Sequence, residues 1–107
     1  MTERWEVEVT EAAYQDLRAA AAYVRETLLA PKAAGNLIAE FEKRAHSLGV
    51  FPEGRPLVSD FELARLGYRW APVGNFMMFY RVDREKHAVT VDRFLYGARD
   101  WKGIVGS

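Results

Sequence analysis

Apolar and polar residues alternate at the start of the chain. From Trp5 to Val9 every second residue is apolar and the residues between are glutamates, which is the period of a strand with one buried face. Thr10 suits the N-cap of a helix, and apolar residues then recur at three- and four-residue spacings as far as Leu28. This pattern predicts a strand followed by an amphipathic helix that ends near Leu29.

A second helical period follows directly. Pro31 cannot extend the first helix but suits the first turn of another, which the apolar spacing carries to Leu48 before Gly49 ends it. The two helices are therefore expected to form a hairpin. The segment 57–66 is polar enough for a loop, with a helical turn predicted at residues 60–64.

The remaining chain reads as three strands and a tail. The strands are predicted at 68–73, 76–82 and 89–96 and are joined by short turns, so they form a meander. The tail from Ala98 to Val105 is expected to add a short helix. Three apolar residues of the tail are available to pack back on the body: Trp101, Ile104 and Val105.

The order strand, helix, helix and three strands predicts a two-layer α+β domain. In it the helical hairpin packs on one face of a mainly antiparallel four-stranded sheet (β-α-α-β-β-β). Along 76–82 alternate residues point to opposite faces, and both sets are partly apolar, with Met77 and Phe79 on the face away from Phe76. That second face is expected to be open, and an open apolar face predicts that another macromolecule covers it.

Composition narrows the class of protein. The 107 residues suit a single domain over 1–107, and the absence of cysteine excludes disulfides and thiolate metal sites. The first residues alternate charged and apolar side chains, unlike a signal peptide, and no apolar run approaches the roughly 18 residues that span a bilayer. A soluble, cytoplasmic protein with no membrane partner is expected.

Charge is balanced overall but unevenly placed. Fifteen basic residues meet fifteen acidic ones, so no net field attracts nucleic acid. Residues 1–53 hold six basic and nine acidic residues, and residues 54–107 hold nine basic and six acidic residues. A polyanion is therefore expected to meet the C-terminal half.

Two segments carry a family resemblance. Gly74–Asp83 (GNFMMFYRVD) and Phe94–Trp101 (FLYGARDW), in the predicted element order, resemble the RelE/ParE family of bacterial type II toxins, also known as plasmid stabilisation proteins, over nearly the whole chain. The resemblance implies a toxin silenced by a cognate antitoxin whose flexible segment wraps it, in a hetero-oligomeric complex. RelE-like members cut mRNA in the ribosomal A site, whereas ParE-like members poison DNA gyrase and need no nuclease chemistry.

A metal-independent ribonuclease needs a base, cations and an acid around the phosphate. Arg99 and Arg69 match two basic positions of the family and are the catalytic candidates. The family's arginine on the third strand is replaced here by Met77, and its C-terminal tyrosine or histidine would fall in 104–105, where neither residue transfers a proton. Tyr96 is the nearest phenol, and its ring is expected to pack into the core instead.

Further residues are candidates for contact with substrate or antitoxin: Arg65, Arg81, Arg93, Met77 and Phe79. The alternative for the arginines is that nearby carboxylates pair with them in solvated ion pairs. His46 and His87 are assigned no role, because surface histidines without one are the commoner case. No ligand spacing supports a metal site, and no cofactor is expected.

Three functional hypotheses follow from the resemblance. The first is growth arrest by ribosome-dependent mRNA cleavage, with Arg99 and Arg69 holding phosphate. The second is inhibition of DNA gyrase by binding alone. The third is a degenerate member that retains only antitoxin binding and autoregulation through that partner.

Overall fold

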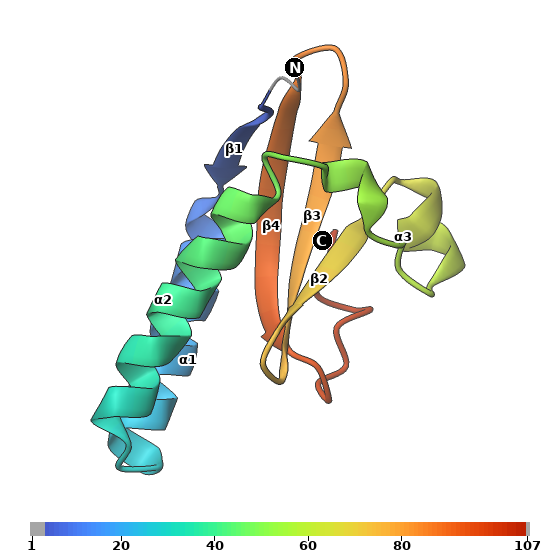
Figure 1. Cartoon of the computed structure of the whole chain (residues 1–107). Coiled ribbons are helices and arrows are strands. Elements are labelled where there is room, and N and C mark those ends of the chain that lie inside the picture. Colours follow the sequence, from blue (N-terminus) through green and yellow to red (C-terminus); the bar gives the residue numbers. More distant parts are fainter. Residues whose placement is uncertain (1–3, 107) are drawn as a thin grey trace.

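The protein is described by a computed structural model over residues 4–106, which contains one sheet and three α-helices (Figure 1). The strands are β1 (Glu6–Val9), β2 (Arg69–Val73), β3 (Phe76–Asp83) and β4 (Ala88–Tyr96). The helices are α1 (Glu11–Ala22), α2 (Pro31–Ser47) and α3 (Phe61–Arg65). The predicted α+β class is confirmed, and α3 is the helical turn expected at residues 60–64.

The four strands form a sheet in the order β1-β4-β3-β2. Both β2 with β3 and β3 with β4 pair antiparallel, whereas β1 pairs parallel with β4. The mainly antiparallel sheet is therefore confirmed. Because β2 has only one strand neighbour, its other edge faces the loop before it and the end of α2.

Local signals fix the start and end of α1. The Thr10 hydroxyl accepts the N–H of Ala13 at 3.1 Å and donates to the carbonyl of Asp92 at 2.9 Å, so the N-cap also ties α1 to β4. The α-helix ends at Ala22 and continues as a π-helical turn over Tyr23–Thr27. The helical path therefore reaches nearly to Leu29 as predicted, but its last turn is wider.

The helical hairpin covers one face of the sheet, and its free end projects past the sheet (Figure 1). Phe41 of α2 lies fully buried with its ring edge against Phe94 of β4, at a centroid distance of 4.9 Å. Tyr80 and Met78 of β3 complete this core from the sheet side. The two-layer packing of hairpin on sheet is thus confirmed.

The second face of the sheet is also covered, by the chain itself. The loop after α2, α3 and the C-terminal tail form a second apolar cluster over it, in which Val58, Leu63 and Val105 are buried. Phe79 of β3 is fully buried, and its ring centroid lies 5.2 Å from that of Trp101. The expectation of an open face is therefore wrong, because segments predicted as loop and tail supply enough apolar surface to close it.

The tail packs back as predicted, but without forming a helix. The N–H groups of Ile104 and Val105 both donate to the carbonyl of Trp101, at 3.0 and 2.9 Å, which makes a single turn. None of the described helices combines the length and the apolar character that crossing a membrane would require.

Candidate functional site

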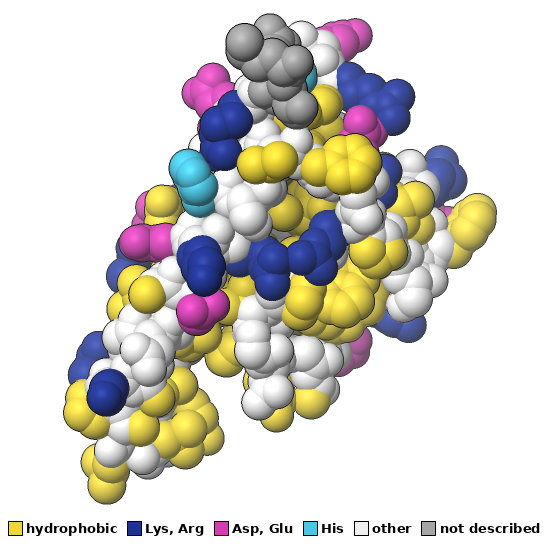
Figure 2. All heavy atoms as spheres, in the orientation of Figure 1, with side chains coloured by type: hydrophobic (Ala, Val, Ile, Leu, Met, Phe, Trp, Pro, Cys, Tyr) yellow, Lys and Arg dark blue, Asp and Glu magenta, His cyan; other side chains and the backbone are white. Residues whose placement is uncertain are grey.

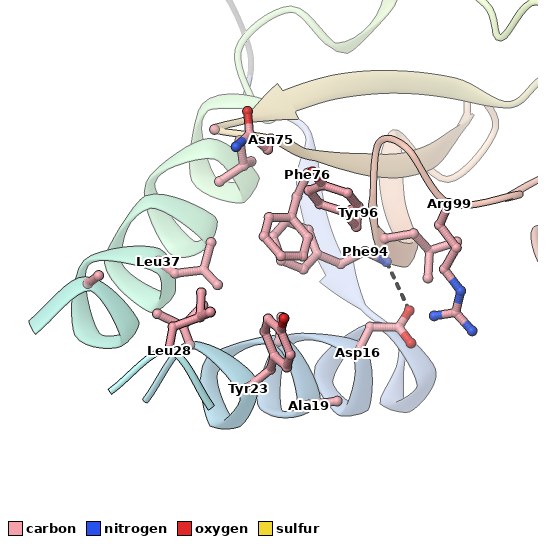
Figure 3. A pocket seen from close by; sticks show the side chains of 16 residues that line it. Asp16, Ala19, Tyr23, Leu28, Leu37, Asn75, Phe76, Phe94, Tyr96 and Arg99 are labelled. Atoms are coloured by element: carbon pink, nitrogen blue, oxygen red, sulfur yellow. Dashed lines mark hydrogen bonds between the residues drawn. The ribbon is translucent and has the colours of Figure 1, made fainter. Parts of the chain in front are cut away.

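An apolar groove separates the projecting hairpin from the end of the sheet (Figure 3). Its volume is about 780 Å³. Tyr23 and Leu28 line it from the hairpin tip and Leu37 from α2, while Phe76 and Tyr96 line it from the sheet. The groove is therefore built by elements that are far apart in the sequence.

The free end of the hairpin extends past the sheet, which leaves a groove between the hairpin tip and the end of the strands (Figure 1). The apolar side chains of the hairpin therefore continue beyond the part that the sheet buries. Tyr23 and Leu28 are each left 56% exposed there, and both point toward the groove.

Stacked rings form the sheet side of the groove. Phe76 stacks on Phe94 with centroids 4.9 Å apart and meets the edge of Tyr96 at 5.8 Å. Tyr96 remains 49% exposed, so it is a wall of the groove and not the core residue that was expected. This wall offers flat apolar area and a single phenol hydroxyl.

Asp16 holds the α1 side of the groove. Its carboxylate accepts from Arg93 Nε at 2.7 Å, from Arg93 Nη2 at 2.9 Å and from the backbone N–H of Phe94 at 3.0 Å. The hydrogen bonds to Asp16 raise the pKa of Arg93. The sequence did not reveal this role of Asp16, because one aspartate in a helix carries no local signal for a contact with a distant strand.

The two catalytic candidates lie well apart in the sheet. Arg99 is exposed at the mouth of the groove, beyond the level at which Tyr96 pairs with Phe76. Arg69 pairs with Tyr80, four residues further along β3, a separation of roughly 13 Å along the strand. Its Nη1 donates to the carbonyl of Arg55 at 2.6 Å. The sequence-predicted pair is therefore not brought together.

The three other candidate arginines each meet a carboxylate, as the ion-pair alternative supposed. Arg65 pairs with Glu62 at 3.1 Å on the surface of α3, and Arg93 pairs with Asp16. Arg81 lies 3.5 Å from Asp92 and 4.7 Å above the centre of the Tyr68 ring. Each of these three guanidinium groups therefore has a carboxylate partner within the chain.

Met77 and Phe79 point to the tail-covered face. Met77 is half-buried beside Gly97, and Phe79 is fully buried. Phe79 is thus beneath the chain's own tail in this structure.

The hydroxyl groups of two buried tyrosines donate hydrogen bonds within the chain. Tyr68 donates to Asp92 at 2.7 Å, and Tyr80 donates to the carbonyl of Pro52 at 2.6 Å. Burial is the main cause that raises the pKa of each phenol to about 12. Neither is suited to exchange protons near neutral pH.

The histidines remain without a chemical role. His46 is exposed beside the Arg4 guanidinium, and the His87 ring stacks on Trp5 with centroids 4.0 Å apart. The described residues contain no group of three metal-binding side chains of the His, Cys, Asp or Glu type.

The model of a known protein family matches most of the chain. The model of the family described as "ParE toxin of type II toxin-antitoxin system, parDE" matches residues 7–101. A comparison with curated proteins finds no significant match.

Solved toxin–antitoxin structures share the fold. A chain of the chromosomal ParDE system from P. aeruginosa superposes with a TM-score of 0.71 at 15% identity, over 87% of this chain and 96% of that one. The RelBE2 complex from Mycobacterium tuberculosis gives 0.60 at 22% identity, over 92% and 98%. The archaeal RelE–RelB complex from Pyrococcus horikoshii gives 0.51 at 16% identity, over 92% and 99%.

Proposed function

The chain belongs to the ParE toxin family of type II toxin–antitoxin systems, and from this premise we propose that it acts by binding its target, without cutting RNA. The proposed target is DNA gyrase in the cytoplasm. The observation that carries the proposal is the absence of an assembled catalytic centre among the described residues. A toxin that works by binding requires an exposed surface and no such centre.

The positions of the cations support this proposal. Hydrolysis by metal-independent chemistry requires several groups converging within hydrogen-bond reach of one phosphate. Arg69 and Arg99 face different parts of the molecule, and the strand position between them that would bring a third cation holds Met77. One arginine at the groove mouth can bind an anion but cannot by itself organise the reaction.

The available acids and bases also support a toxin that does not cut RNA. Tyr68 and Tyr80 stay protonated because burial raises their pKa values to about 12, and their hydroxyls are already donors to Asp92 and Pro52. Tyr96 is exposed but lies on the groove wall, level with Phe76, whereas Arg69 is level with Tyr80, four residues further along β3. The described residues therefore offer no acid and base across a common phosphate.

We further propose that a cognate antitoxin occupies the groove. The groove is long, apolar and open, and its walls are Tyr23, Leu28, Leu37, Phe76 and Tyr96. An amphipathic segment laid between the hairpin and the sheet would bury these side chains, and its acidic residues would meet Arg99 at the mouth. The stored form would then be a hetero-oligomer of toxin and antitoxin.

Two assays in parallel test the mode of action. The purified chain is incubated with gyrase and supercoiled DNA, and separately with programmed ribosomes. We expect cleaved DNA trapped with gyrase and intact mRNA in the ribosomal A site.

Cleavage of mRNA in the A site would instead establish the ribonuclease hypothesis. In that case Arg99→Ala should abolish cutting, while Lys102→Ala, an exposed cation three residues further on, should leave it unchanged. Inactivity in both assays would leave only the third hypothesis, a member reduced to antitoxin binding.

A further inference from the structure

Four cations lie along the outer edge of β2, and none of them lines the groove. Lys43 and Arg44 belong to the end of α2, Arg69 belongs to β2, and Arg55 lies in the loop that runs beside β2. Figure 2 shows dark-blue side chains in a row between α2 and this edge. These four residues are called the basic strip.

Backbone carbonyls fix two of these guanidinium groups. Arg44 Nε donates to the carbonyl of Pro72 at 3.0 Å, and Arg69 Nη1 donates to the carbonyl of Arg55 at 2.6 Å. A carbonyl orients the guanidinium but does not cancel its charge. Both arginines are half-buried, so their conformations are restricted before any ligand arrives.

Several arginines elsewhere in the described chain meet carboxylates instead. Arg18, Arg25 and Arg65 each pair with a glutamate on the same helical segment. No member of the basic strip forms an ion pair with a described residue. The strip therefore concentrates positive charge on a chain whose net charge is zero.

The nearby carboxylates do not neutralise the strip. Glu53 is bound by Arg84, whose Nε lies 2.8 Å from its carboxylate. Glu40 lines a shallow pocket of about 210 Å³ together with Lys43 and Arg44, and is the one acidic residue of that pocket. Glu40 is thus the one carboxylate of the pocket that holds Lys43 and Arg44, and Glu53 is already paired, so the remaining positive charge favours an anionic ligand.

We propose that the basic strip binds the phosphate backbone of duplex DNA independently of base sequence. A row of positions suits successive phosphates better than a single small anion, and fixed guanidinium groups bind phosphate oxygens strongly. The choice of DNA over RNA rests on the proposed function, since gyrase acts on DNA.

Direct binding tests the inference. The full chain is titrated into a labelled duplex of arbitrary sequence while fluorescence anisotropy is followed between 25 and 150 mM salt. We expect saturable binding at low salt that weakens with salt, with a log–log slope near −3, because about three or four phosphates are neutralised. Absence of saturable binding at 25 mM salt would overturn the proposal.

Two triple variants separate the strip from general charge. Lys43→Gln/Arg44→Gln/Arg55→Gln removes three strip cations. Arg18→Gln/Arg25→Gln/Lys86→Gln removes three exposed cations elsewhere, so both variants carry the same formal charge of −3 relative to the native chain. We expect the strip variant to bind roughly tenfold or more weaker with a slope reduced by about 2 to 3, and the control to change less than about threefold.

Equal losses in the two variants would overturn the proposal, since bulk charge would then explain binding. Thermal melting of both variants checks that each is folded. An acidic peptide that binds the native chain but not the strip variant, in the absence of saturable duplex binding, would assign the surface to a protein partner instead.

Failure of the inference and failure of the proposed function are distinguishable. If the chain binds the duplex but traps no cleaved DNA with gyrase, DNA binding by the strip is supported and the gyrase proposal is wrong. If the chain poisons gyrase while neither it nor its strip variant binds free DNA, the proposed function is supported and the inference about the strip is wrong.

Discussion

The carboxylate of Asp16 joins α1 to β4, two elements that are far apart in the sequence. It binds Arg93 through two hydrogen bonds and the Phe94 N–H through a third, at the edge of β4 where β1 has ended. Asp16→Ala would leave a partly buried guanidinium and a backbone N–H without partners. We expect the free energy of unfolding to fall by about 2–3 kcal/mol, measured by urea denaturation.

Glu11→Ala is the matched control, because Glu11 lies on the same helix and also pairs with an arginine. Both side chains of that pair are exposed, so its loss should cost less than about 1 kcal/mol. Equal effects of the two substitutions would contradict the anchoring role of Asp16.

Tyr68 and Tyr80 predict a loss of stability in alkaline solution. Their pKa values are raised from 10.0 to about 12, mainly by burial, so folding favours the protonated phenols. Their contribution is fully present below pH 10 and is lost as the pH rises through about 12. We expect the free energy of unfolding to fall across this interval.

Denaturation of Tyr80→Phe at several pH values measures the effect. The variant should lose about 1 kcal/mol at pH 7 with the hydrogen bond to Pro52, and its stability should fall less steeply above pH 10 than that of the native chain. An unchanged slope would show that Tyr80 does not contribute to the alkaline transition.

At the scale of elements, the sequence predicts best where the signal is local. Thr10 as N-cap, Pro31 at the start of α2 and the alternation along β3 each act within a few residues, and the structure contains the elements they predict. The width of the last turn of the first helix was not predictable in this way. The sequence predicted the candidate site less well. Strand register separates Arg69 from Arg99, and no short motif encodes strand register.

The second face of the sheet illustrates the same limit. Alternation along β3 correctly places Phe79 opposite Phe76, but it cannot say which segment covers Phe79. The answer depends on Trp101 and Val105, which follow two turns and show no clear helical period. The sequence therefore could not predict that the tail packs over Phe79, and only the structure shows this contact.

Trp101→Ala tests whether the tail closes that face. Trp101 is half-buried over Phe79, so its truncation should cost about 2 kcal/mol of unfolding free energy and expose an apolar patch. We expect a lower melting temperature and new binding of an apolar dye. Lys86→Ala, at an exposed position between β3 and β4, should change neither, and an equal effect would show that the tail does not cover Phe79.

At the scale of the whole molecule, the free end of the hairpin projects past the sheet, and the groove lies between the two. The basic strip lies along the edge of β2, and the pocket beside its Lys43 and Arg44 adjoins the groove at Val73 and Gly74, but none of the four strip residues lines the groove. An antitoxin in the groove and DNA on the strip would thus contact separate residues. Neutralisation of the toxin and binding to DNA should therefore be separable by mutation.

Two adjacent leucines allow that separation to be measured. Leu28 lines the groove, whereas Leu29 is 81% exposed, does not line the groove and has a positive φ of 53° that asparagine adopts readily. We expect Leu28→Asn to weaken antitoxin binding roughly tenfold, because an apolar contact in the groove is replaced by an amide that must be desolvated. Leu29→Asn should bind the antitoxin like the native chain.

The measurement is calorimetric titration of each variant with the protein encoded beside this gene, together with growth of cells that co-express both. Cells with Leu28→Asn should lose the protection that the partner provides, while the variant keeps its toxicity and its affinity for duplex DNA. Equal binding by the two asparagine variants would mean that the antitoxin docks elsewhere, since only one of these leucines faces the groove.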